Sequence, residues 1–420
     1  HMQYTKDVTI ANCRLFTGDD SLAGLMWENV TVTNCILNTS CHALRVGGRN
    51  VAVSNCVVYG PGAYPHRSTA RHNTMSAILH LGVRPPTAGV KPGEEWRELF
   101  PSDNIMLSGL TIQNVRSPFY MESRACYNTY PDGPPSVGLK KIFVHNLTAI
   151  DAGRLPLAVD GHPESRVESV VLNDVRLAYE GGITAQHADG YSIDPVSGLY
   201  FNNVDHVELH NVRIDFKQKD ARPVLMAENV KRLEIDRLAV PHAPENYPVY
   251  VLEKVGEVLV GGKPAPAAAA QIRGLEVDLS RTGGKAIVGE PFNAVVSVEN
   301  TGAEGLAEVR LRFRQESFSR SVWLGEKQTR QVLFANLRCT APGDYAMAAG
   351  RFQKTVRAEA MPAPGPVAAP YSTFANVKAE FARLSDALYL VAAETYAYHL
   401  HMIGGADRYA AAYQKGSLPE

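Results

Sequence analysis

Three segments near the start of the chain share one pattern of alternating apolar and small polar residues that ends in Asn-Cys. They are Asp7-Val-Thr-Ile-Ala-Asn-Cys13, Asn29-Val-Thr-Val-Thr-Asn-Cys35 and Asn50-Val-Ala-Val-Ser-Asn-Cys56. Alternation with a period of two predicts a β-strand in each segment. The cysteines recur at intervals of 22 and 21 residues, which is too short for a propeller blade and suits one coil of a parallel β-helix.

Successive coils of a β-helix place equivalent residues above one another, so this stretch predicts two rows. The first is a ladder of side-chain amides from Asn12, Asn34 and Asn55, and the second is an inward-facing row of Cys13, Cys35 and Cys56. None of the six cysteines lies in a CxxC pair, which argues against a structural zinc site. We expect no metal, and we expect buried free thiols ahead of disulfides, because cysteine packs as a small hydrophobe.

The pattern returns with looser spacing further along the chain. Later strands are expected to begin near Asn104, Lys141, Glu168, His206 and Asn229. The residues between them form loops that leave the stack, and such loops commonly build the binding groove of a solenoid. The longest loop lies between Cys56 and Asn104 and carries a basic cluster: His66, Arg67, Arg71, His72, His80 and Arg84. This cluster belongs either to a groove or to an ordinary solvated loop.

Changes in residue composition and pattern divide the chain into three parts, all of which are expected to be β-rich. Residues 1–262 are expected to form a right-handed parallel β-helix, which a Pro/Ala-rich linker follows. Residues 271–360 alternate over about seven strands with Gly and Asn turns, as is typical of a small immunoglobulin-like β-sandwich. Beyond a second Pro/Ala-rich linker, residues 371–420 are expected to form a short C-terminal β segment.

Composition narrows the classes of partner. The chain has 42 Lys and Arg residues against 43 Asp and Glu residues, without the basic excess that is typical of a nucleic-acid-binding protein. No apolar run reaches the roughly 18 residues that a membrane-spanning helix needs. The chain opens with His1-Met2, which we interpret as a cloning scar, so the absence of a signal peptide says nothing about secretion. We expect a secreted or periplasmic protein.

Candidate chemistry lies in two strings, Thr17-Gly18-Asp19-Asp20-Ser21-Leu22 and Cys41-His42-Ala43-Leu44-Arg45-Val46-Gly47-Gly48. Asp20 and His42 are 22 residues apart, or one coil, which predicts that they lie roughly 5 Å apart along the stack. Asp19 and Asp20 are a pair of adjacent acids. One acid of such a pair can protonate a glycosidic oxygen while the other activates water, so the pattern suits inverting glycoside hydrolysis. Gly-Asp-Asp is also an ordinary turn sequence.

The two strings resemble glycoside hydrolase family 28, the polygalacturonases, which carry Gly-Asp-Asp and, one coil later, Gly-His-Gly-(Leu/Ile)-Ser-Ile-Gly-Ser. The resemblance covers residues 3–240, and the run Leu155–Ser165 also resembles bacterial members. It implies a pectin-degrading hydrolase that needs no cofactor and acts on acidic polysaccharide or oligosaccharide. Carried over by position, Asp20 is the general acid, Asp19 helps to activate water, and His42 supports them.

Substrate contacts follow less directly from the resemblance. The family's Arg-Ile-Lys motif is not recognisable here, and Arg67 or Arg71 is our candidate replacement. Arg45 stands where the family has Ser, so it either binds a substrate carboxylate or pairs with Asp19 or Asp20. The remaining candidates for a groove that binds uronic sugars are His66, Tyr120 and Arg124, with Glu122 and Tyr127 beside them. A role of Tyr120, Glu122, Arg124 and Tyr127 in the core or on the surface fits the sequence equally well.

The family has a further catalytic aspartate, in an Asn-Thr-Asp motif one coil before Gly-Asp-Asp, and that position falls at or before His1. Either the working β-helix begins upstream, or the protein has lost this acid and binds glycan or cuts it with a rearranged set. An exposed first coil favours association with a second copy of the chain. The alternatives to a hydrolase are a non-catalytic glycan-binding or adhesion protein and a polysaccharide lyase.

Overall fold

The computed structural model describes residues 2–66, 70–82, 99–125, 138–183, 196–243 and 247–360. The predicted C-terminal segment 371–420, Arg67, Arg84 and Tyr127 lie outside the described residues. Contacts divide the chain into two units, of which the first holds residues 1–182, 196–244 and 250–265. Each unit is described by itself.

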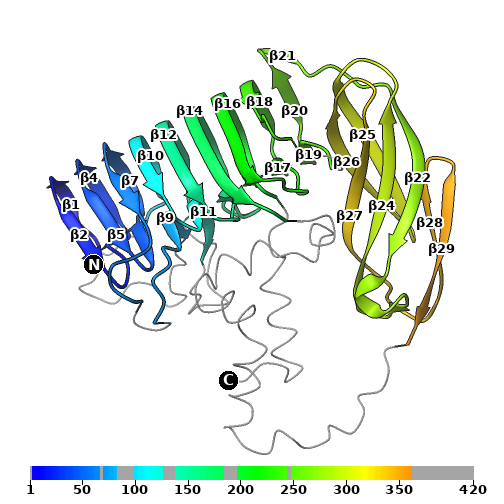
Figure 1. The fold of residues 1–420 in the computed structure, drawn as a ribbon, viewed down its shortest axis with the longest axis horizontal. Coiled ribbons are helices and arrows are strands. Elements are labelled where there is room, and N and C mark those ends of the chain that lie inside the picture. Colours follow the sequence, from blue (N-terminus) through cyan, green and yellow to red (C-terminus); the bar gives the residue numbers. More distant parts are fainter. Residues whose placement is uncertain are drawn as a thin grey trace, which may run out of the picture. The chain divides into compact units, whose positions relative to one another are not determined.

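The first unit is a parallel β-helix, in which each coil adds one strand to a long sheet (Figure 1). The strands of this first sheet are β1 (Lys6–Ala11), β4 (Trp27–Thr33), β7 (Gly48–Ser54), β10 (Asp103–Gln113), β12 (Lys141–Ala152), β14 (Val167–Gly181), β16 (Val204–Gln218), β18 (Arg232–Ala239) and β20 (Glu257–Val260). The short strands β2 (Arg14–Thr17), β5 (Ile36–Thr39) and β8 (Val57–Tyr59) extend it in the first coils, and β21 (Lys263–Pro264) pairs antiparallel with β20.

A second parallel sheet runs along the same coils. Its strands, in order, are β3 (Leu22–Ala23), β6 (His42–Arg45), β9 (Ser76–Gly82), β11 (Ser117–Ala125), β13 (Leu157–Asp160), β15 (Leu199–Asn202), β17 (Leu225–Glu228) and β19 (Tyr250–Glu253). Apolar residues of equal register stack in the interior, as in the fully buried row Val30, Val51, Ile105, Ile142, Val170, Val207 and Leu233. The predicted parallel β-helix is confirmed.

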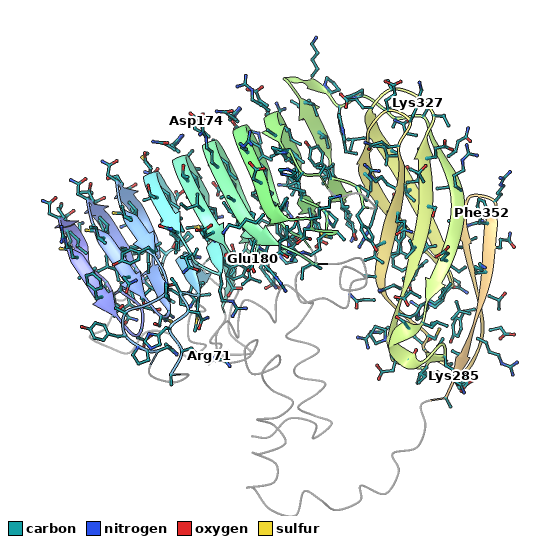
Figure 2. The ribbon with its side chains drawn as sticks, in the orientation of Figure 1. Arg71, Asp174, Glu180, Lys285, Lys327 and Phe352 are labelled. Carbon is teal, nitrogen blue, oxygen red and sulfur yellow. The ribbon has the colours of Figure 1, made fainter. Side chains whose placement is uncertain are left out.

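One corner of each coil, which follows β1, β4 and β7 and lies within the longer strands β10, β12, β14 and β16, requires a residue with positive φ. Asn12, Asn34 and Asn55 occupy it with φ of 59°, 53° and 52°, and later coils place Gly109, Asn146, Asp174 and Asn211 there (Figure 2 labels Asp174). Asn, Asp and Gly are the residues that adopt this left-handed conformation most easily. The Asn-Cys signature therefore reports a backbone requirement of the fold.

The predicted amide ladder exists, but in another row. In the first coils it lies near the start of each strand of the first sheet, where each side-chain amide donates to the equivalent residue of the preceding coil. These hydrogen bonds run from Asn29 to Asp7 at 2.8 Å, from Asn50 to Asn29 at 3.0 Å and from Asn104 to Asn50 at 3.0 Å. The expectation for Asn12, Asn34 and Asn55 was wrong, because the residue that stands above Asn55 in this row is Gly109, which has no side-chain amide. The corner row carries such a hydrogen bond only further along, where Asn211 donates to Asp174 at 2.5 Å. The cysteine row is as expected: Cys13, Cys35 and Cys56 are free thiols, and the last two are fully buried.

The second unit has two sheets of mainly antiparallel strands. One contains β22 (Ala270–Asp278), β24 (Pro291–Asn300) and β27 (Thr329–Arg338); the other contains β23 (Ala286–Ile287), β25 (Gly305–Phe313), β26 (Glu316–Leu324), β28 (Gly343–Ala349) and β29 (Phe352–Glu359). A short 3-10 helix, η2 (Ser280–Thr282), lies between β22 and β23. The sheets meet in a core where the rings of Phe292 and Phe313 pack edge to face at 5.5 Å. The immunoglobulin-like assignment stays a prediction.

Candidate active site

Asp19 and Asp20 lie in a tight turn that joins β2 to β3. The backbone carbonyl of Asp19 accepts hydrogen bonds from the hydroxyls of Thr17 and Thr39, each at 2.6 Å. The Asp19 carboxylate accepts the amide of Asp20 at 3.0 Å. Gly18 precedes the pair, and a Cβ there would lie only 2.2 Å from the carbonyl oxygen of Pro65. The sequence Thr-Gly-Asp-Asp is thus fixed by packing, which holds both carboxylates in place.

The 22-residue interval does place His42 beside Asp20. The backbone amide of His42 donates to Oδ1 of Asp20 at 3.3 Å, and the amide of Ser21 donates to the carbonyl of His42 at 3.1 Å. The imidazole Nδ1 of His42 lies 2.7 Å from the hydroxyl of Ser76, which occupies the same register on β9. Burial lowers the pKa of His42, although the charge of Asp20 partly opposes this effect. A neutral imidazole therefore stands next to the two acids.

Arg45 lies at the other end of β6 from His42 and turns toward the same cluster. Its Nη1 is 3.7 Å from Oδ2 of Asp20, and the two side chains are 24% and 12% exposed. Of the two interpretations of Arg45, the structure shows the ion pair with Asp20. The remaining exposure of the guanidinium leaves it within reach of a ligand from solvent.

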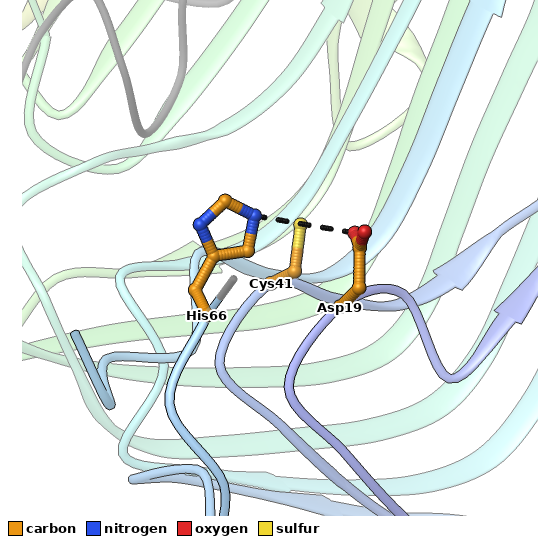
Figure 3. Close-up of side chains that lie close together, drawn as sticks. All are labelled: Asp19, Cys41 and His66. Carbon is orange, nitrogen blue, oxygen red and sulfur yellow. Dashed lines mark ion pairs between the residues drawn. The ribbon is translucent and has the colours of Figure 1, made fainter. Parts of the chain in front are cut away.

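His66 reaches the cluster from the loop that follows β8. Its Nε2 lies 4.0 Å from Oδ1 of Asp19, and the side chain of Cys41 lies close to both (Figure 3). Burial raises the pKa of the Cys41 thiol, and the charges of Asp20 and Asp19 add to this effect. Among the residues that the structure describes, two groups have ligand atoms that lie within 4.8 Å of one another and could hold a metal ion: Asp19, Cys41 and His66, and Asp20, Cys41 and His42.

Sequence reasoning did not single out Cys41 as a functional residue. The sequence has no CxxC spacing that would signal a metal site, and Asp19, Cys41 and His66 come from separate coils. His66 itself belonged to the predicted basic cluster, but its proximity to Asp19 depends on the path of the loop. No spacing rule for a regular coil would have found it.

The other predicted substrate-binding residues differ in how far they are exposed to solvent. Arg71 is half-buried, and its carbonyl accepts the amide of His66 at 2.7 Å, so it belongs to the same loop (Figure 2). Arg124 lies on β11, where the structure describes only its backbone. Tyr120 is fully buried, and its hydroxyl donates to Oε2 of Glu122 at 2.9 Å. This burial does not fit the expectation that Tyr120 lines an open groove.

His80, which we had placed in the exposed basic loop, is instead a buried residue of β9. Its Nδ1 lies 2.7 Å from the carbonyl of Glu122, and its Nε2 lies 2.8 Å from the hydroxyl of Ser102. A carbonyl can only accept, so Nδ1 carries the proton and Nε2 accepts from Ser102. The Ser102 oxygen in turn accepts the amide of Gly48 at 2.8 Å. Burial lowers the pKa of His80 to about 4.

These observations define a class: a parallel β-helix with two carboxylates, a histidine and an arginine gathered on its first coils. Sequence comparison finds a similar protein of known class. An exopolygalacturonase from Platanus acerifolia is 23% identical over 185 residues, which are 43% of this chain and 45% of that protein. The aligned region thus spans less than half of the relative. The finding establishes a distant similarity to a polygalacturonase.

Other comparisons add nothing to this relationship. No family model matches the chain, and no solved structure matches it. Within the described residues, no helix is long and apolar enough to cross a membrane.

Proposed function

We propose that this protein is a glycoside hydrolase that cleaves acidic, uronic-acid-containing polysaccharide or oligosaccharide of the pectin type. The observation that carries the proposal is the contact between Asp20 and His42 across adjacent coils, with Asp19 and Arg45 beside them. The distant similarity to an exopolygalacturonase supports the same reaction class. A β-helix alone would not, because one fold serves many functions.

The proposed mechanism is inverting and uses two carboxyl groups. Asp20 donates its proton to the glycosidic oxygen as the bond to the anomeric carbon breaks. Asp19, which is 48% exposed, takes a proton from the water that attacks that carbon from the opposite face. His42 positions Asp20 through its backbone amide, which donates to Oδ1 at 3.3 Å. No cofactor takes part.

Arg45 is assigned to substrate binding. In the free protein its guanidinium lies 3.7 Å from Asp20 and remains partly exposed. A uronic carboxylate can bind this guanidinium through a bidentate pair of hydrogen bonds, and a neutral sugar cannot form such a pair.

The proposed substrate also places the protein in its compartment. Polymeric uronic acids do not cross a bilayer unaided, so the working location is proposed to be secreted or periplasmic.

A reducing-end assay on polygalacturonate and rhamnogalacturonan oligosaccharides tests the proposal. Asp20→Asn should lose about 10²- to 10⁴-fold in rate, the usual contribution of a general acid. Asp174→Asn is the matched control, because it changes an exposed aspartate at a corner where asparagine is equally suitable. Equal rates for wild type and Asp20→Asn would refute the assignment.

Two further outcomes would replace the proposal with an alternative. Binding of these saccharides without any turnover would identify a glycan-binding or adhesion protein. A product with the near-ultraviolet absorption of an unsaturated sugar would identify a lyase. The same assay samples therefore distinguish all three functions.

A further inference from the structure

The thiol of Cys41 lies in the middle of the cluster, yet the proposed hydrolysis gives it no part. The geometry points to a second property of this place: Asp19, Cys41 and His66 bind one divalent ion of the zinc class. The inference goes beyond the proposed function, because it depends on the positions of three ligand atoms and on no reaction.

The distances come close to those of a metal site. The carboxylate oxygen of Asp19, Sγ of Cys41 and a ring nitrogen of His66 lie within 4.8 Å of one another (Figure 3). Nε2 of His66 is 4.0 Å from Oδ1 of Asp19. Tetrahedral zinc with bonds of about 2.0–2.3 Å holds its ligand atoms roughly 3.3–3.8 Å apart. The ligand atoms therefore have to approach one another by at most about 1.5 Å for zinc to bind.

The backbone around the three residues is already fixed. Residues that lie two coils apart in a β-helix are separated by about 10 Å along the stack, so His66 reaches Asp19 only because its loop folds back. Two bonds to the preceding coil hold the loop: the amide of Ala63 donates to Asn38 at 2.6 Å, and the hydroxyl of Ser40 donates to the carbonyl of Tyr64 at 2.5 Å. The cost of ordering the site is therefore already met by folding.

The donor set selects the ion. A thiolate, an imidazole and a carboxylate together suit zinc, whereas magnesium and calcium prefer oxygen ligands alone. Three protein ligands leave the fourth position for water, and the 48% exposure of Asp19 opens that position to solvent. When the ion binds, the Cys41 thiol releases its proton to solvent.

The competing set of Asp20, Cys41 and His42 is less suited to a cation. The guanidinium of Arg45 lies 3.7 Å from Asp20 and would repel a second positive charge. Nδ1 of His42 already lies 2.7 Å from the hydroxyl of Ser76. Because Cys41 belongs to both sets, only one ion can use the thiolate, and the ion pair of Asp20 with Arg45 favours the set with Asp19 and His66.

Cobalt substitution tests the site directly. The full chain, freed of metal by a chelator, is titrated with Co²⁺ while the thiolate-to-cobalt charge-transfer band is followed, and Zn²⁺ is then added to displace the cobalt. We expect one ion per chain. Cys41→Ser should abolish the band, and His66→Gln should weaken binding at least 100-fold, because loss of even an outer partner of a metal ligand costs 10- to 100-fold.

Cys13→Ser is the matched control, because Cys13 is a free, half-buried cysteine of the repeat outside the cluster. It should keep the band and the affinity of the wild type. No band in the wild type, or a band that survives Cys41→Ser, would overturn the site. Because the wild type alone can give the first of these results, the test does not depend on the folding of a variant.

The ion has a consequence that rests on the proposed function. It occupies the carboxylate of Asp19, so Zn²⁺ should inhibit hydrolysis, and Cys41→Ser should relieve the inhibition. Inhibition that is equally strong in Cys41→Ser would refute this link. A cobalt band in a protein that hydrolyses no acidic glycan would leave the metal site standing and refute the hydrolase proposal alone.

Discussion

Protonation of His80 should destabilise the β-helix below neutral pH. The neutral form fits its surroundings completely, because Nδ1–H donates to the Glu122 carbonyl and Nε2 accepts from Ser102. A second proton on Nε2 would face the Ser102 hydroxyl, whose oxygen already accepts the Gly48 amide. The ring is also buried, so a positive charge there loses its hydration.

The size of the effect follows from linkage. The pKa of His80 is lowered from 6.5 to about 4 in the folded protein, so between these values the unfolded chain binds a proton that the folded chain does not. The stability that His80 contributes is therefore fully present above pH 6.5 and is lost as the pH falls toward 4. At about 1.4 kcal/mol for each pH unit, the loss amounts to about 3 kcal/mol.

Urea unfolding at a series of pH values between 7 and 4 measures this loss. In His80→Asn, the amide can still donate to Glu122 but cannot gain a charge, so its free energy of unfolding should fall by about 3 kcal/mol less than that of the wild type over this range. His72→Asn is the control: its Nδ1 also lies 2.8 Å from a carbonyl, that of Gly62, but the residue is exposed, so we expect the pH dependence of the wild type. Parallel curves for wild type and His80→Asn would refute the reasoning.

Three further predictions concern binding and stability. Arg45→Gln should raise KM for oligogalacturonate about 10-fold and remove any preference for this substrate over its methyl ester, as parallel kinetics on the two substrates would measure. An unchanged preference would contradict the role of the guanidinium. Asp220→Ala should lower the free energy of unfolding in urea by about 3–5 kcal/mol, because both side chains of the bidentate Asp220–Arg222 pair are only 1% exposed. The double variant with Arg222→Met should recover most of this loss, and a double variant as unstable as Asp220→Ala would contradict the explanation. Asn34→Ala should lower the thermal midpoint, with a cost of about 1 kcal/mol for a left-handed alanine, whereas Asn34→Gly should cost less, and the reverse order would show that the side chain rather than the backbone matters.

Much of the fold was accessible from the sequence because the β-helix repeats itself. A pattern such as Asn29–Cys35 encodes a strand, a left-handed corner and a buried thiol, and each property depends only on residues a few positions apart. The contact of His42 with Asp20 was predictable for the same reason, since one coil of constant length separates them. The error in the amide ladder had a local cause: the sequence shows two asparagines per coil, and only the structure distinguishes the corner position from the stacked one.

The sequence by itself determined the coil, its period and the residues that occupy equivalent positions, because hydrogen bonds between neighbouring coils repeat one local geometry. The tertiary structure alone decided where the irregular parts lie. The loop after β8 folds back until His66 meets Asp19 and Cys41, and β9 turns His80 into the interior. These outcomes depend on side chains such as Asn38 and Ser40, which bind backbone groups more than 20 residues away, and no periodic pattern records such contacts.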